Sequence, residues 1–108
     1  MEISDRFRGY LPVVVDLETG GFSKDDNPIL EVACSFVTMR DGQLCVKDNA
    51  NWSLEPFEGS HIEPASLKVT KIDLDDPNRN ALDEREALVE FFQTCLLYTS
   101  PSPRDSDQ

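Results

Sequence analysis

The sequence predicts an α/β fold in which a three-stranded antiparallel meander is followed by a helix. Three observations lead to this prediction. The apolar run 11–15 contains three consecutive valines and favours a buried strand. The dipeptide Asp41-Gly42 separates two further strand-like segments, as in a tight hairpin. A helix start signal then follows near Asp83. With 108 residues, the chain has room for one domain.

The three strands are predicted from residue patterning. The first runs from about Pro12 to Glu18, and its unbroken apolar start predicts burial on both faces. The third begins near Gln43 and runs to about Lys47; a polar break or bulge at 48–51 precedes its continuation at 52–54. The second strand, about 29–40, alternates, and one of its faces carries Leu30, Val32, Cys34 and Phe36.

Two helices are predicted after the strands. Residues 65–71 form one or two turns. Asp83 is the predicted N-cap of a longer helix, and Glu86 closes a capping box three residues later. This helix is predicted to end near Thr94, with an apolar side made of Leu88, Val89, Phe91 and Phe92.

Asp16 and Glu18 interrupt the first strand two residues apart. Their side chains point to the same side of a strand, and their Cα atoms lie about 6.6 Å apart. Two carboxylates at the end of a buried strand are costly unless a cation compensates them, and a divalent ion with oxygen ligands would do so. The pattern predicts a metal site on a central strand, facing a cleft. A solvated strand end is the alternative.

Composition bounds the partners and the compartment. The net charge of −11 argues against nucleic-acid binding by bulk electrostatics, although a carboxylate–metal site would bring its own countercharge. No run of 18 apolar residues is present to span a membrane. The first residues lack the basic and apolar regions of a signal peptide. We therefore expect a cytoplasmic protein without a membrane partner.

The run from Val13 to Phe22, followed by 29–33, resembles the first motif of the DEDD superfamily of 3′-to-5′ exonucleases. Segments 6–10, 55–59 and 72–79 are similar, more narrowly, to the ribonuclease T family. The resemblance extends from about Arg6 to Phe92. It implies that residues 1–94 are the amino-terminal part of an exonuclease domain, with a ribonuclease-H-like fold that is truncated here.

The resemblance implies a 3′-to-5′ exoribonuclease that trims the 3′ ends of tRNA and other structured RNAs by two-metal phosphodiester hydrolysis. It also implies two Mg²⁺ ions, a homodimer in the complete protein, and single-stranded DNA as a second candidate substrate. Asp16 and Glu18 match the first two metal ligands and catalytic carboxylates. The later ligands and the general base are absent, so we expect this chain alone to be inactive. The alternative is a non-catalytic acidic binding module of the same fold.

Two further residues match substrate-binding positions of the family. Phe22 matches an aromatic that stacks on the 3′-terminal bases; it could instead pack over the Gly20-Gly21 turn. Thr19 matches a contact to the terminal nucleotide, through its backbone or its hydroxyl, and could instead cap the turn. A second family aromatic falls on Val69, which cannot stack, so the base preference stays open.

Residues 95–108 differ in character from the rest of the chain. Two prolines and two serines break the helical pattern, which predicts a disordered tail. Residues 95–105 also resemble one translated frame of a common transposase-type sequencing adapter. The tail is therefore interpreted as non-native and without function.

Overall fold

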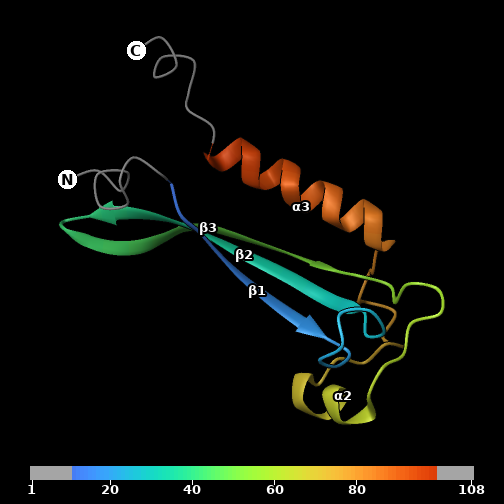
Figure 1. Cartoon of the computed structure of the whole chain (residues 1–108). Coiled ribbons are helices and arrows are strands. Elements are labelled where there is room, and N and C mark those ends of the chain that lie inside the picture. The colour runs from blue at the N-terminus through green and yellow to red at the C-terminus, as the bar shows by residue number, and fades with distance from the viewer. Residues whose placement is uncertain (1–10, 100–108) are drawn as a thin grey trace.

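The computed structural model describes residues 11–99, which form three strands followed by two helices (Figure 1). The strands pair antiparallel in the order β1-β2-β3, so the sheet is a meander. The predicted α/β architecture, a three-stranded antiparallel sheet with helices after it, is confirmed. The elements are β1 (Val13–Thr19), β2 (Ile29–Arg40), β3 (Gln43–Ser53), α2 (Pro64–Thr70) and α3 (Glu84–Thr99).

The β2–β3 hairpin closes at the predicted dipeptide. Asp41 and Gly42 have φ values of 52° and 79°, and positive φ at both central residues is the signature of a type I′ turn. The predicted interruption at 48–51 is not a break, because β3 is continuous from Gln43 to Ser53. The irregularity is instead a shift in register that leaves Lys47 as the extra residue of a β-bulge.

β1 lies at the edge of the described sheet, because it pairs with β2 alone. The prediction of a central strand for Asp16 and Glu18 is therefore wrong for this chain. The prediction that the valine run is buried on both faces is also wrong, since Val14 and Val15 are 57% and 47% exposed. Burial on both faces needs a covering layer on each side, and the residues from 11 to 99 do not supply one at β1.

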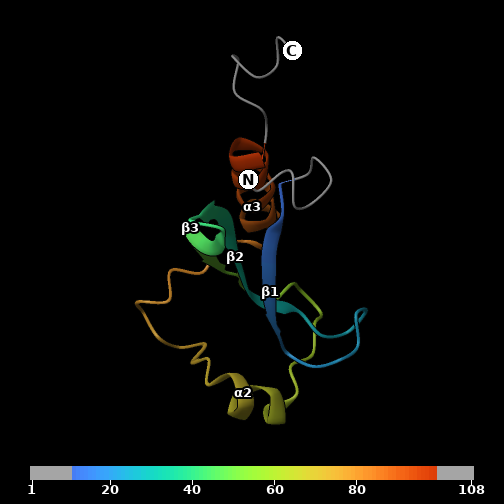
Figure 2. The same ribbon diagram turned by 90° about the vertical axis from the view of Figure 1, so that its left-hand side faces the viewer.

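The core lies between α3 and one face of β2 and β3 (Figures 1 and 2). The predicted alternation of β2 is confirmed, because all four residues assigned to one face are buried. Trp52 of β3 meets Phe91 of α3 edge to face, with ring centroids 5.8 Å apart. The buried cluster consists of Val32, Cys34, Phe36, Leu54, Ala87 and Phe91.

α3 begins at the predicted N-cap, but fewer of its apolar residues pack against the sheet than predicted. Asp83 caps it: its Oδ2 accepts a hydrogen bond from the Arg85 N–H at 3.1 Å. Phe91 is buried, whereas Val89 and Phe92 are 45% and 61% exposed. At about 100° per residue, positions 89 and 92 turn away from the side that carries residue 91. The predicted apolar side is thus only partly the packed side.

α3 continues to Thr99, past the end predicted near Thr94. No helix-breaking residue occurs until Pro101, which disfavours helical structure in the residue before it. The Tyr98 ring stacks on Phe36 with centroids 4.1 Å apart, and its hydroxyl donates to the carboxylate of Asp48. Residues 95–99 are therefore helical rather than disordered. The rest of the predicted tail, and the family-like segment 6–10, lie outside the described residues.

The hydrogen bond between Tyr98 and Asp48 shifts the pKa of both groups. It raises the pKa of the Tyr98 phenol. It also lowers the pKa of the Asp48 carboxyl, with a smaller contribution from the Asn49 N–H. Both shifts favour the hydrogen-bonded pair at neutral pH.

The connector between the two helices is held to the sheet by Arg79. Its Nη2 donates to the carbonyl oxygens of Leu30 and Leu54 at 3.0 and 2.7 Å. Asp73 and Asp76 close local turns by accepting backbone N–H groups two residues ahead. Neither described helix has the length and apolar content needed to cross a membrane.

Candidate functional site

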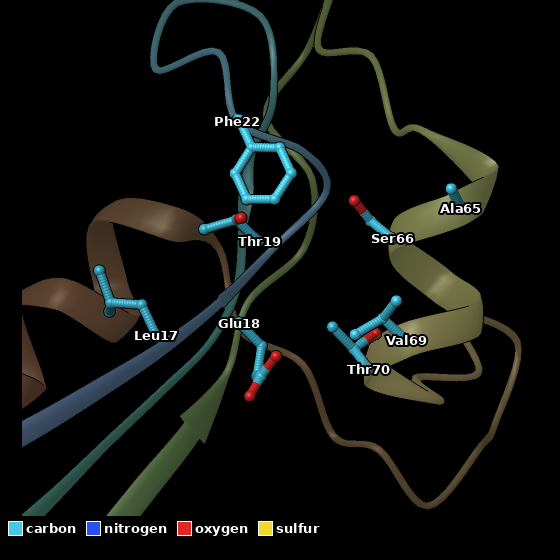
Figure 3. Close-up of a pocket in the computed structure, with 8 residues that line it drawn as sticks. All are labelled: Leu17, Glu18, Thr19, Phe22, Ala65, Ser66, Val69 and Thr70. Atoms are coloured by element: carbon cyan, nitrogen blue, oxygen red, sulfur yellow. The ribbon is translucent and has the colours of Figure 1, made fainter.

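A pocket of about 250 Å³ lies between the end of β1 and α2 (Figure 3). Half of its lining comes from β1 and the turn that follows, and half from one side of α2. Three of the four predicted site residues are among them. The lining residues are Leu17, Glu18, Thr19, Phe22, Ala65, Ser66, Val69 and Thr70.

Backbone hydrogen bonds hold α2 opposite the end of β1. The Gly20 carbonyl accepts from the Glu63 N–H at 2.7 Å, directly before the helix begins. The His61 N–H donates to the Asp26 carbonyl at 2.7 Å, and the Asn27 side-chain amide donates to the His61 carbonyl at 2.6 Å. The pocket is thus built by tying the segment before α2 to the turn after β1.

Gly21 is required by the packing of this turn. Its φ is 153°, and a Cβ added there would overlap the side-chain amide of Asn27. Asn27 Oδ1 also accepts the Ser23 N–H at 2.8 Å. The close approach that glycine permits here is therefore to Asn27, which links the turn to the segment before α2.

The two predicted metal ligands lie on the same side of β1 but differ in their surroundings. Glu18 lines the pocket and is partly buried, whereas Asp16 is exposed and outside the lining. In the register with β2, Glu18 lies opposite Glu31, so like charges face each other across the ladder. Within residues 11–99, no group of three or more His, Cys, Asp or Glu side chains is arranged to hold a metal ion.

The structure bears on the alternatives that were left open for Phe22 and Thr19. Phe22 is fully exposed, at 107%, so its ring does not pack over the glycine turn. The Thr19 hydroxyl donates to the Gly21 carbonyl at 2.7 Å, so the hydroxyl caps the turn. Figure 3 shows Phe22 on the β1 side of the pocket and Val69 on the α2 side. Val69 is 81% exposed.

Sequence reasoning did not find Glu31, Ser66 or Thr70 as residues near the site. Glu31 is brought beside Glu18 by the antiparallel register, which depends on the turn between β1 and β2. Ser66 and Thr70 are four residues apart and therefore share one side of α2. Their i, i+4 spacing was the only available signal, and it becomes informative once the facing element is known.

No protein-family model matches the chain. Curated proteins do match it. It is 42% identical over 94 residues to a protein of Shewanella denitrificans named Ribonuclease T, an alignment that covers 86% of this chain and 42% of the relative. A protein of the same name from Shewanella frigidimarina is 44% identical over 89 residues, covering 82% of this chain and 40% of the relative.

The chain thus spans about two fifths of the length of these curated relatives. Because the alignment covers 86% of the 108-residue chain, it includes most of the described residues 11–99. The predicted resemblance is confirmed: over most of its length, this chain is homologous to proteins named Ribonuclease T.

Proposed function

We propose that this chain is the amino-terminal part of a 3′-to-5′ exoribonuclease with a ribonuclease-H-like fold. The complete protein would trim the 3′ ends of tRNA and other structured RNAs, with single-stranded DNA as a second substrate. Homology to proteins named Ribonuclease T supports a nuclease. The observation that carries the proposal is one pocket lined by both a carboxylate, Glu18, and a fully exposed aromatic ring, Phe22.

Asp16 and Glu18 are the proposed metal ligands and catalytic carboxylates. Their chemistry fits Mg²⁺, which takes oxygen ligands, keeps several of its waters and is often bound through one or two carboxylates. Both side chains have access to solvent, so a hydrated ion can reach them. The facing carboxylate of Glu31 adds negative potential on the same side of the sheet. Metal ions held by Asp16 and Glu18 would supply activation of a water and stabilisation of the leaving oxygen.

Phe22 and Thr19 are the proposed substrate contacts. An exposed ring at a pocket mouth can stack on a base, which contributes about 1–3 kcal/mol. The Thr19 hydroxyl already donates to the turn, so we assign the backbone of Thr19, rather than the hydroxyl proton, to the terminal nucleotide. In this proposal, the carboxylates of Asp16 and Glu18 face the scissile phosphate, and Phe22 contacts the terminal base.

A second candidate function is a non-catalytic acidic module of the same fold. The net charge of −11 favours it, because phosphate-binding surfaces are normally basic. The native coding sequence, read from the contig upstream of the tail and on past about Thr94, separates the two. A frame that supplies a later Asp and a His-x4-Asp pattern supports the enzyme, and a stop near Thr94 supports the module. We further propose a homodimeric parent protein, on the resemblance alone, and a cytoplasmic location, as expected from the sequence.

Metal binding tests the proposal without an activity measurement. Addition of Mn²⁺ to the chain should broaden the amide resonances of residues 16–18 selectively, because the paramagnetic ion lies near them. Asp16→Asn and Glu18→Gln should each weaken this effect. Asp25→Asn, a matched change in the exposed turn, should leave it unchanged. Broadening centred on the connector at 73–76 would contradict the assignment.

A further inference from the structure

The packing of α3 on the sheet fixes which residues of the two elements meet. At one end of the contact, Phe91 meets Trp52 edge to face, and Trp52 lies opposite Val32 in the ladder. Toward the other end, Tyr98 stacks on Phe36 with ring centroids 4.1 Å apart. The helix therefore runs along β2 from the level of Val32 to that of Phe36.

Two cysteines meet between these aromatic contacts. On β2, Cys34 is the residue of the buried face that comes directly before Phe36. On α3, Cys95 lies one turn before Tyr98 and on the same side of the helix. Cys95 packs against the buried cluster that contains Cys34. Burial raises the pKa of the Cys34 thiol, and the neighbouring Cys95 thiol raises it further, so the two sulfur atoms are close enough to interact.

The third cysteine, Cys45, has different surroundings. It lies near the β2–β3 hairpin, opposite Thr38, and among residues 11–99 it is outside the buried cluster and the side chains packed against it. Cys34 is 2% exposed, whereas Cys45 and Cys95 are partly exposed. A dissolved oxidant therefore reaches Cys45 or Cys95 first, and of these two only Cys95 has a second thiol beside it.

We propose that Cys34 and Cys95 form a modification site at which a small-molecule disulfide, such as glutathione disulfide, is exchanged for a covalent bond between β2 and α3. The Cys95 thiolate attacks one glutathione sulfur, so that a mixed disulfide forms and the first glutathione leaves as a thiolate. The Cys34 thiolate then attacks the Cys95 sulfur, and the second glutathione leaves. Two protein thiols are oxidised by two electrons, glutathione disulfide is reduced, and the two thiol protons pass to the departing thiolates.

The bond fixes α3 to the sheet. A link between residues far apart in the sequence restricts the unfolded chain, and its effect grows with the length of the closed loop. Cys95 is the first residue of the segment interpreted as non-native, so the site is assigned to the 108-residue chain as it stands. The inference does not depend on the proposed nuclease function, because neither cysteine lines the pocket beside β1.

Peptide mapping after oxidation tests the inference. The 108-residue chain is incubated with glutathione disulfide under native conditions, alkylated with iodoacetamide and digested with trypsin without reduction. Trypsin cuts the chain between the three cysteines, so each lies on its own peptide and a linked pair is identified by mass. The peptides of Cys34 and Cys95 should be linked, and dithiothreitol should separate them. The Cys45 peptide should be alkylated or carry glutathione.

Two variants serve as matched controls, because each removes one partly exposed thiol. Cys45→Ser should still form the link, whereas Cys95→Ser should leave Cys34 reduced. Oxidation should raise the urea midpoint, followed by Trp52 fluorescence, in the wild-type chain and in Cys45→Ser but not in Cys95→Ser.

Oxidation in urea shows whether the fold directs the pairing. The unfolded chain should also link Cys34 to Cys45, because these two are closer in sequence and close a shorter loop. Glutathione that stays on Cys95 while Cys34 remains reduced would overturn the inference. A link to Cys45 under native conditions, or the same mixture of links with and without urea, would also overturn it.

Discussion

Asn27 is the side chain on which the geometry of the pocket depends, and its removal has a definable cost. Its amide donates to the His61 carbonyl at 2.6 Å and accepts the Ser23 N–H at 2.8 Å. A neutral hydrogen bond contributes about 0.5–1.5 kcal/mol net. Asn27→Ala should therefore lower the free energy of unfolding by about 1–3 kcal/mol. Asn78→Ala, at an exposed side chain in the connector, is the matched control and should change it by less than about 0.5 kcal/mol.

Gly21 makes the same reasoning testable by a double-mutant cycle. Gly21→Ala adds strain at φ 153° and displaces the Asn27 amide. The strain costs about 1–3 kcal/mol, and the displacement costs the two Asn27 hydrogen bonds in addition. In the Asn27→Ala background, only the strain remains. The two single effects should therefore sum to about 1–3 kcal/mol more than the double mutant loses.

Urea denaturation followed by tryptophan fluorescence measures these energies. The only tryptophan, Trp52, packs against Phe91 and reports on the docking of α3 to the sheet. It lies outside the pocket lining, so its signal reports stability and not the local change at α2. Additivity of the two substitutions within about 0.5 kcal/mol would refute the claim that Gly21 exists to admit Asn27.

Four more outcomes are expected. Arg79→Met should lower the free energy of unfolding by about 2–4 kcal/mol in the urea assay, because two hydrogen bonds from a partly exposed cation to the sheet are lost. Tyr98 has a raised pKa, so its contribution to stability is complete below about pH 10 and is lost as the pH rises through the folded-state pKa; Tyr98→Phe should remove this alkaline loss in Trp52-monitored melts. Asp48 has a lowered pKa, so its contribution is present above about pH 4 and is lost as the pH falls further, a trend that Asp48→Asn should remove. The chain itself should release no nucleotides from 3′-end-labelled RNA with Mg²⁺, and release that Asp16→Asn abolishes would show that its catalytic groups are sufficient.

The elements of the fold followed from local signals that the structure respects. Alternation placed the buried face of β2 correctly, and Asp41-Gly42 placed the hairpin, because both depend only on neighbouring residues. The burial of β1 was mispredicted for the opposite reason. An unbroken apolar strand predicts burial on both faces only when other elements pack against both. Residues 11–99 supply no such covering elements at β1.

Only the part of the site that lies on β1 and the turn after it could be predicted from the sequence. Asp16, Glu18, Thr19 and Phe22 were found because they are close in sequence and match a known motif. The α2 side of the pocket was not, since it depends on hydrogen bonds between segments more than thirty residues apart, such as that from Asn27 to His61. The end of α3 was predicted too early. Residues 95–99 contain no helix-breaking residue, so they continue the helix even if they are non-native.

The strand order has a consequence for how the chain acquires its structure. Because each strand pairs with its neighbour in the chain, the sheet closes short loops only, and low contact order favours fast folding. The meander can therefore assemble during synthesis as soon as β3 has emerged, before α3 exists. Docking of α3 is then the late event, and formation of the Trp52–Phe91 contact marks its completion.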